Sequence, residues 1–278
     1  RECEFLTFLL HTSDFWKGQT KSPTQIREHA LHVTNKITCL GYLLRDFRSP
    51  TESRAVVAMD STMSKVGESN GRSGKSFIGQ AISKFVAQAE IDGPGLSNDD
   101  QYMFSGVTRQ TKNIFIDDIN ENFKIDKFKQ RITGSLNVNI KQGARFVIDF
   151  SEAPKFYITT NHALSNLDDS ALARLIFMSF SDWYNRAYAP YQEFGHYFFV
   201  EWDDRQWQLF DNLLCECVMI YMRSLEYGWT LKGTGAVPPP MENLEKRTLR
   251  QEMGEFFLSW AEAYFAPDAG HLNTRIIR

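Results

Sequence analysis

The sequence of 278 residues predicts an α/β fold, with a central, mainly parallel sheet and helical segments before and after it. Two observations lead to this prediction. Short apolar runs of strand length recur in the middle of the chain, and polar residues follow them. The first run is followed by a polar, glycine-rich loop and then by apolar residues at helical spacing.

The composition is that of a globular protein, with 42% hydrophobic and 23% charged residues. No apolar run is long enough to cross a bilayer, so we expect no membrane role. The four scattered cysteines are typical of reduced thiols, so we expect a cytoplasmic location. Of the four cysteines only Cys215 and Cys217 are close, and their spacing suits neither a zinc site nor a disulfide framework. The chain starts at Arg1, so we expect it to be a piece of a longer polypeptide. The net charge of -3 leaves room for a local basic strip that binds nucleic acid.

The first predicted element is a helix over about residues 24–47, where apolar positions recur at helical spacing. It belongs to an N-terminal helical segment, residues 1–50. A buried strand is predicted at residues 55–59, followed by a polar loop at 61–74. From Lys75 the apolar residues recur through Val86 on one face, which predicts a helix.

The loop between that strand and that helix has the composition of a phosphate-binding loop. Its glycines let backbone N–H groups face a triphosphate, and the start of a helix favours anions. Lys75 would neutralise the β- and γ-phosphates, and the Ser76 hydroxyl would ligate Mg²⁺. The strict G-x-x-x-x-G-K-[ST] pattern requires a glycine where Ser69 stands, and a flexible surface turn is the alternative. The predicted ATP-binding residues are Gly71, Arg72, Ser73, Gly74, Lys75 and Ser76.

Two further buried strands are predicted, and polar side chains lie at the carboxyl end of each. Residues 113–116 lead into Asp117, which we assign to the metal, and Asp118, which we assign to the attacking water. Such a pair can instead be a turn or a helix cap. Residues 155–159 lead to Asn161, which is placed to bind the γ-phosphate or the attacking water.

Arg174 is a candidate for a guanidinium that reaches the γ-phosphate of a neighbouring subunit. A surface salt bridge is the alternative. With this residue the predicted P-loop ATPase core extends over residues 51–182.

A hairpin is predicted between the strands at 113–116 and 155–159. Residues 136–140 and 145–149 alternate between apolar and polar side chains on either side of a turn. Between positions 124 and 145 the sequence has six basic residues and a single acidic residue, Asp126. Lys141 and Arg145 flank the tip and suit contacts with the backbone of single-stranded nucleic acid. A solvated charged face is the alternative. The basic residues are Lys124, Lys127, Lys129, Arg131, Lys141 and Arg145.

Residues 183–278 are predicted to be mainly helical. A helix is expected at 207–225, a linker rich in glycine and proline at 228–240, and a second helix at 241–265. The aromatic residues between Trp183 and Trp207 are expected to pack the core against these helices.

The order of these motifs resembles that of superfamily 3 helicases: Walker A, Walker B, a B-prime segment, motif C and an arginine finger. More narrowly, residues 35–264 look like the helicase part of primase-helicases from viruses, phages, plasmids and bacterial mobile elements. Five segments carry the resemblance: Asn70–Ser76, Ile116–Asn120, Ile132–Gly134, Pro154–Lys155 and Ile158–Asn161.

The resemblance implies an AAA+-like P-loop core that hydrolyses ATP with Mg²⁺ and assembles into a hexameric ring. The half-site within one subunit would be formed by Lys75, Ser76, Asp117, Asp118 and Asn161. The adjacent subunit would supply Arg174, and Lys141 would grip single-stranded DNA in the ring channel. A primase domain on the same polypeptide and a phage, mobile-element or bacterial host would fit this family.

Two functions are compatible with these motifs. The first is an ATP-dependent DNA helicase or translocase of a replication protein. The alternative is a P-loop protein that binds ATP to organise or switch a complex and unwinds little. The basic hairpin favours the first, because a switch does not need it. A small-molecule kinase is less attractive, since no arginine-rich lid follows the core.

Overall fold

The computed structural model of the chain describes residues 2–50, 53–60, 72–97, 99–120, 123–162, 164, 169–227, 253–254 and 260. Most of the predicted phosphate loop, including Gly71, therefore lies outside the described residues. The predicted linker at 228–240 and nearly all of the predicted helix at 241–265 do so as well. Within the described ranges no helix is long and apolar enough to span a membrane.

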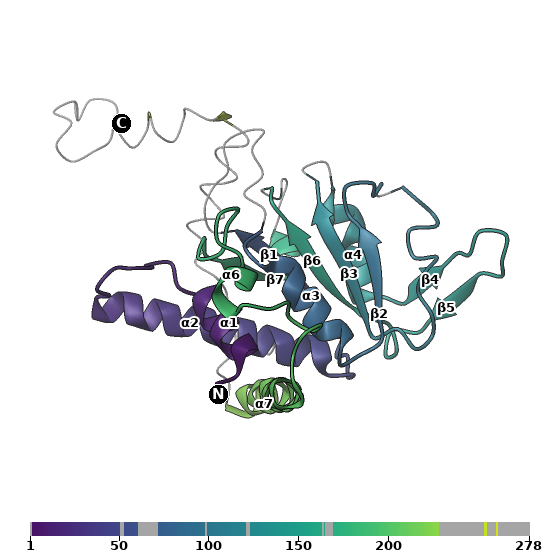
Figure 1. Cartoon of the computed structure of the whole chain (residues 1–278). Helices are drawn as coiled ribbons and strands as arrows, with labels where there is room; N and C mark the ends of the chain where they lie inside the picture. The colour runs from purple at the N-terminus through teal and green to yellow at the C-terminus, as the bar shows by residue number, and fades with distance from the viewer. Residues whose placement is uncertain are drawn as a thin grey trace, which may run out of the picture.

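A five-stranded sheet forms the centre of the fold, in the order β2-β3-β6-β1-β7 (Figure 1). Every neighbouring pair of strands in it is parallel. The prediction of an α/β, P-loop NTPase-like core around a parallel sheet is thus confirmed. Its strands are β1 (Ala55–Asp60), β2 (Gln88–Asp92), β3 (Asn113–Ile119), β6 (Lys155–Thr160) and β7 (Leu175–Phe180).

Side chains alternate across the sheet and feed two separate hydrophobic clusters. In β1, Val56 and Ala58 belong to one cluster, whereas Ala55, Val57 and Met59 belong to the other. This follows from the two-residue repeat of a strand. Because both faces of the sheet are covered, β1 and β7 are fully buried and mostly apolar, as in other buried parallel sheets. The edge strand β2 is only partly buried.

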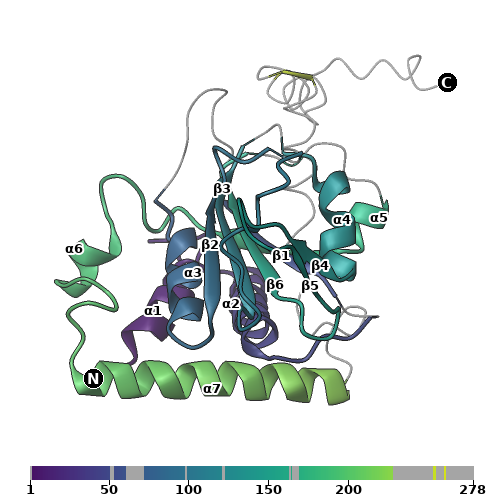
Figure 2. The same cartoon turned by 90° about the vertical axis from the view of Figure 1, so that its right-hand side faces the viewer.

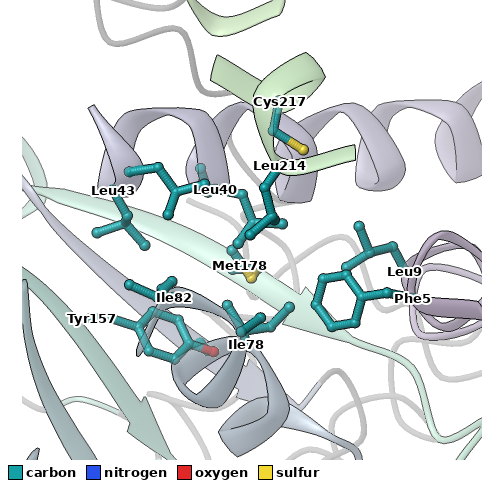
Figure 3. Packing of buried hydrophobic residues seen from close by; sticks show 14 of the residues in the cluster. Phe5, Leu9, Leu40, Leu43, Ile78, Ile82, Tyr157, Met178, Leu214 and Cys217 are labelled. Carbon is teal, nitrogen blue, oxygen red and sulfur yellow. The ribbon is translucent and has the colours of Figure 1, made fainter. Parts of the chain in front are cut away.

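Four helices pack on one face of the sheet and share the first cluster, which Figure 3 shows from close by. Two short helices and a small hairpin cover the other face (Figure 2). The first group is α1 (Glu4–His11), α2 (Pro23–Leu44), α3 (Lys75–Ser83) and α7 (Asp204–Tyr227). The second is α4 (Ile125–Thr133), α5 (Asp169–Leu172) and the antiparallel pair β4 (Leu136–Val138) and β5 (Phe146–Ile148).

Helices α2 and α7 cross closely at Gly41. A Cβ atom at this position would lie 2.2 Å from the carbonyl oxygen of Cys217 and 2.6 Å from Cβ of Tyr221. Only glycine allows this backbone approach.

The start of α2 is fixed by a capping box, in which the Gln25 N–H donates to Ser22 Oγ (3.3 Å) and Ser22 N–H donates to Gln25 Oε1 (2.8 Å).

Two buried lysines tie α2 to the sheet. Lys36 Nζ donates to the carbonyl oxygen of Ser179 at the end of β7 (2.6 Å) and to Ser13 Oγ (3.0 Å). Lys155 Nζ donates to the carbonyl oxygens of Tyr42 and Arg45, at the last turn of α2. Burial lowers the pKa of each ammonium to about 7. These contacts fix the end of one strand and the start of another relative to the same helix.

Several predicted elements are confirmed, and their bounds differ in part. The first long helix is α2, and the predicted strands correspond to β1, β3 and β6. Helix α3 ends earlier than predicted, at Ser83, and Phe85 lies beyond it with 41% of its surface exposed. The N-terminal helix α1, the edge strands β2 and β7 and the helix α6 (Pro190–Phe194) were not predicted.

Candidate functional site

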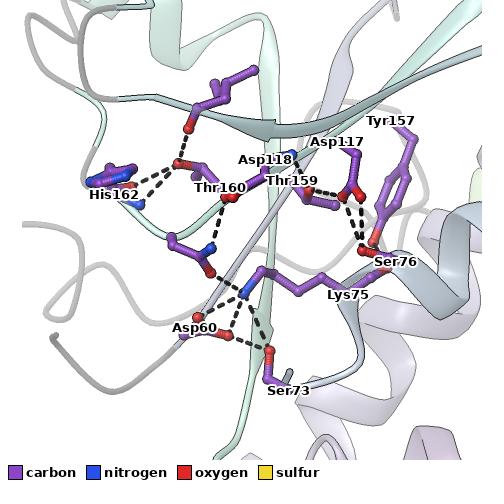
Figure 4. A network of polar contacts seen from close by, with 12 residues as sticks. Asp60, Ser73, Lys75, Ser76, Asp117, Asp118, Tyr157, Thr159, Thr160 and His162 are labelled. Atoms are coloured by element: carbon purple, nitrogen blue, oxygen red, sulfur yellow. Dashed lines mark hydrogen bonds and ion pairs between the residues drawn. The ribbon is translucent and has the colours of Figure 1, made fainter. Parts of the chain in front are cut away.

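The carboxyl ends of β1, β3 and β6 lie side by side, because these strands are parallel neighbours. In doubly wound sheets this edge is where ligands bind. It brings the predicted residues Asp117 and Asp118 next to the start of α3 (Figure 4). Asn161 lies there too, in contact with Lys75 and Asp118.

Helix α3 begins directly after Gly74, whose φ of 100° is in the left-handed region. A Cβ atom there would also lie 2.6 Å from the ring of Phe8 in α1. Glycine is therefore required both by the backbone and by the helix behind it. The hydroxyl of Tyr157 donates to the carbonyl oxygen of Lys75 (2.8 Å), and burial raises the pKa of Tyr157 well above its ordinary value. The first turn of α3 is thus held between β6 and α1.

The Lys75 ammonium is surrounded by oxygen atoms. It lies 2.7 Å from each carboxylate oxygen of Asp60 and 2.8 Å from Oδ1 of Asn161. Ser73 Oγ lies 3.3 Å from it and donates a hydrogen bond to Asp60. The side chains of Lys75 and Asp60 are each only 6% exposed. A buried ion pair therefore stands at the centre of the predicted phosphate site, and Asp60 was not among the predicted site residues.

Ser76 and Asp117 form a second polar group beside this pair. Ser76 Oγ lies 2.9 Å and 3.2 Å from the two carboxylate oxygens of Asp117. The Thr159 hydroxyl donates to Asp117 Oδ1 (2.6 Å) and so fixes the orientation of the carboxylate. Hydroxyl and carboxylate oxygens are ligands that Mg²⁺ prefers. The two residues predicted to hold the metal thus lie together.

Asp117 and Asp118 both line this site although they are consecutive on a strand, where successive side chains point to opposite faces. The pairing of β3 with β6 shifts its register between Ile116 and Ile119, and Asp118 has a φ of 60°. This irregularity turns the second carboxylate back toward the site. There Asp118 Oδ1 accepts from Asn161 Nδ2 (2.7 Å).

Gly93 supports the irregular turn from the neighbouring strand. Its N–H donates to the carbonyl oxygen of Asp117 (2.7 Å). A Cβ atom at Gly93 would lie 2.4 Å from that oxygen and 2.6 Å from the nitrogen of Ile119. The position of the two carboxylates thus depends on a glycine at the end of β2.

One wall of a cavity of about 480 Å³ is lined by Lys75, Ser76, Asp117, Asp118, Thr159 and Asn161. The described residues predicted to bind or act on ATP are in that wall, apart from Ser73 and Arg174; Ser73 contacts the site through Asp60 and Lys75. The opposite wall is formed by the segment that contains α6. Its lining residues are Ala189, Pro190, Tyr191, His196, Tyr197 and Phe198.

No family model matches the chain, and no curated protein sequence matches it. Among solved structures, two apo structures of the C-terminal region of NrS-1 are similar, with TM-scores of 0.42 and 0.45 and identities of 14% and 12%. They match 95% and 94% of this chain, which spans only 54% and 56% of theirs. JCV helicase bound to a thiazolopyridine acetamide is similar with a TM-score of 0.36 and 9% identity, over 93% of this chain and 69% of that one. At these values the likeness transfers no residue role.

Arg174 is not brought to the cavity of its own chain. It precedes β7, and its carbonyl oxygen accepts from the N–H of Ala55 at the start of β1 (2.9 Å). It therefore lies at the amino ends of the strands, opposite the cavity. Its guanidinium donates to the carbonyl oxygen and to Oγ of Ser170, both at 2.7 Å. A role for Arg174 in a neighbouring subunit's site stays a prediction.

The predicted basic hairpin is present, as β4 and β5. Lys141 and Arg145 are exposed on the connection, and the turn is closed by a hydrogen bond from Gly143 N–H to the carbonyl oxygen of Ile140 (3.0 Å). Arg131 departs from the predicted basic strip, because its guanidinium packs 5.6 Å from the centre of the Phe128 ring and is half-buried. Arg131 is thus less exposed than Lys124, Lys141 and Arg145.

Sequence reasoning missed three parts of the site. Asp60 and Thr159 belong to strands that were predicted, and their place near the carboxyl ends of parallel strands was the available signal. The aromatic wall was expected to be packing alone. Phe199 and Trp202 are buried and do pack into the core. Phe198 is buried too but also lines the cavity, whereas Tyr191 and Tyr197 line the cavity and are exposed.

Proposed function

We propose that this chain is the ATP-hydrolysing motor of a DNA helicase or translocase of the superfamily 3 type, within a replication protein. One observation carries the proposal. Lys75 and Ser76 at the start of α3, Asp117 and Asp118 at the end of β3, and Asn161 after β6 converge on one cavity. A P-loop NTPase needs a cation, a metal-binding hydroxyl and carboxylate, and a group that orients water, and these residues supply all of them.

The start of α3 and Lys75 bind the phosphates in this proposal. The N–H groups of the first helical turn have no partner within the helix and favour anions. Lys75 adds a full positive charge. For the triphosphate to approach, the ammonium must share its contacts with Asp60 or exchange them for phosphate oxygens.

Ser76 and Asp117 suit Mg²⁺, which prefers oxygen ligands. No group of three or more His, Cys, Asp or Glu side chains in the described part of the chain could hold a metal by itself. Mg²⁺ would therefore complete its shell with phosphate oxygens and water, as is usual at nucleotide sites. When bound, the ion would neutralise charge on the phosphates.

Asp118 and Asn161 position the attacking water. The Asn161 amide contacts Lys75 through its oxygen and Asp118 through its nitrogen. It thus links the phosphate-binding cation to the carboxylate that accepts the water's hydrogen bond. A change in the position of Lys75 on binding phosphate would reach Asp118 through this one side chain.

Movement of single-stranded DNA is assigned to the hairpin, where Lys141 and Arg145 would contact phosphates. A homo-hexamer would place Arg174 of one subunit at the cavity of the next. A primase domain elsewhere on the polypeptide, a cytoplasmic location and a phage, mobile-element or bacterial host are further parts of the proposal. The resemblance in the order of motifs supports the ring, the primase domain and the host, and the scattered cysteines support the location.

ATP hydrolysis with and without single-stranded DNA tests the proposal. We expect DNA to stimulate hydrolysis by the unaltered chain. Lys75→Ala should abolish turnover, and Asp118→Asn, which keeps the side-chain shape, should lower it. Lys141→Ala should keep the basal rate and lose the stimulation. Lys84→Ala removes an exposed lysine at the far end of α3 and is the matched control.

If Lys75→Ala hydrolyses ATP at the normal rate, the assigned site is wrong. Nucleotide binding with no DNA stimulation, and with Lys141→Ala equal to the unaltered chain, would favour the assembly or switch protein instead. Size measurements with an ATP analogue and DNA complement the assay, because a ring supports the motor.

A further inference from the structure

The cavity has two chemically different walls. The first carries Lys75, Ser76 and the carboxylates, and the second is largely aromatic. Phe77 of α3 also lines the cavity. A ligand that fills this space would combine a charged, oxygen-rich end with a flat apolar end.

Tyr191 and Tyr197 differ from the aromatic residues around them. Phe198, Phe199 and Trp202 have exposed fractions of 5–7% and pack into the core. Tyr191 and Tyr197 are 45% and 60% exposed, and both line the cavity. Their ring centres lie 4.6 Å apart with an angle of 33° between the planes. These two rings are thus paired at the surface of the cavity instead of being used for packing.

The backbone brings the two rings together. Gly195 ends α6 with a φ of 79°, and its N–H donates to the carbonyl oxygen of Tyr191 (2.9 Å). The left-handed residue reverses the chain, so that Tyr197 returns beside Tyr191. The Tyr197 N–H then donates to Glu201 Oε2 (2.7 Å), which fixes the far side of the turn.

Contacts with other segments hold this turn in place. Glu193 accepts from the Tyr184 hydroxyl (2.6 Å) and lies 2.9 Å from His11 Nδ1 in α1. His196 Nε2 lies 2.7 Å from Glu4 Oε2, also in α1. The aromatic pair is therefore presented by a segment that side-chain contacts with α1 and Tyr184 hold in place, which lowers the entropy cost of binding.

We propose that Tyr191 and Tyr197 form the nucleobase subsite of this cavity and bind the base of the nucleoside triphosphate by stacking. The inference rests on the proposed function, because it assigns the phosphates to Lys75 and Ser76 on the opposite wall. Aromatic rings stack on any base through its π-face, and the rings here are accessible. The subsite distinguishes a nucleotide from a base-free polyphosphate.

Binding of two probes by calorimetry separates the two walls. The probes are MgATP and magnesium tripolyphosphate, which has the phosphates without the nucleoside. In the double variant Tyr191→Ala/Tyr197→Ala we expect the affinity for ATP to fall about tenfold or more, since each stacked base contributes about 1–3 kcal/mol. The affinity for tripolyphosphate should stay the same.

Three further variants sharpen the test. Tyr191→Phe/Tyr197→Phe keeps the rings and should retain the affinity for ATP. Tyr102→Ala removes a tyrosine that is 37% exposed and does not line the cavity, so it should change neither affinity. Lys75→Ala should weaken both probes. Thermal melting of each variant checks that the fold is intact.

The outcomes distinguish this inference from the proposed function. If the unaltered chain binds neither probe, both fail. If it binds both, and the double alanine variant binds ATP normally or loses both probes equally, the nucleobase subsite is wrong and the phosphate site stands. Weaker binding of single-stranded DNA with unchanged binding of ATP would assign the pair to DNA and overturn the inference as well.

Discussion

The carboxylate of Asp60 holds the Lys75 ammonium through both of its oxygens, each at 2.7 Å. The two side chains come from the end of β1 and the start of α3, on either side of the phosphate loop. The Asp60 carboxylate thus lies beside Lys75, where the phosphates of the proposed ligand would also bind. Binding of a triphosphate would place like charges close together unless the pair rearranges.

Asp60→Asn removes this charge and keeps the shape of the side chain. We expect the affinity for magnesium tripolyphosphate to rise by about tenfold, because one short-range repulsion between unit charges is lost. The ligand-free protein should melt at a lower temperature, since the buried ammonium loses its counter-ion. Calorimetry and thermal melting measure the two effects. A fall in affinity would mean that Asp60 assists binding.

Gly93→Ala should lower ATP turnover. The added Cβ would collide with the backbone of Asp117 and Ile119 and displace both carboxylates of the site. Gly95→Ala is the control in the same turn, where a Cβ would have no atom within 4 Å. We expect turnover to fall by about tenfold or more in the first variant, since displacements of about 1 Å at a site are costly. Equal rates in the two variants would contradict the role given to Gly93.

Gly41→Ala should destabilise the fold without altering the site. The methyl group would press α2 and α7 apart, and such overpacking costs about 1–3 kcal/mol. Alanine has a higher helix propensity than glycine by about 1 kcal/mol, which would offset the cost only if the two helices could relax. The 2.2 Å approach to a backbone oxygen leaves little relief. Denaturant unfolding should show a lower midpoint than in Gly106→Ala, where the space is open. An unchanged midpoint would mean that the helices shift freely.

His32 should make stability depend on pH. Burial lowers its pKa from 6.5 to about 3, with a smaller effect from the charge of Lys36. Between these values the unfolded chain binds a proton that the folded chain does not, so the free energy of unfolding falls as the pH falls from 6.5 toward 3. The slope for one proton is at most about 1.4 kcal/mol per pH unit. In His32→Gln the free energy of unfolding should change less with pH over this interval. If it changes as steeply as in the unaltered chain, another group causes the pH dependence.

Lys141 and Arg145 should contribute to DNA binding through charge. If each contacts one phosphate, the double alanine variant should reduce the slope of log affinity against log salt by about 0.7 for each residue with single-stranded DNA. Titrations at several salt concentrations measure this slope. Lys84→Ala should leave it unchanged. The same slope in the double variant would remove the hairpin from the DNA-binding surface.

Much of the central fold was predictable because buried parallel strands leave plain apolar runs. The runs that became β1, β3 and β6 were recognised. The polar ends of β3 and β6 lie side by side, where Asp118 accepts a hydrogen bond from Asn161. Edge strand β2 was missed because its residues are only partly buried and include charged side chains. Asp60 lies at the end of a strand that was recognised, but its pairing with Lys75 depends on a distance that no local pattern records.

The site's finer geometry also lay beyond the sequence. An Asp-Asp pair at a strand end does not reveal that the second residue adopts a φ of 60°, since this follows from the register with β6 and from the space at Gly93. Similarly, a cluster of aromatic residues does not reveal which rings are buried. Tyr197 and Phe198 are adjacent, yet only the second joins the core.

Helix α1 does not line the cavity, yet it contacts residues of both cavity walls. Phe8 stands behind Gly74, Glu4 contacts His196, and His11 contacts Glu193. A fragment cut just before β1, where the recognisable motifs begin, would keep every strand and the whole polar wall and would lose all three supports. The smallest piece of this protein that preserves the cavity therefore begins before Glu4, about seventy residues ahead of the lysine that defines the site.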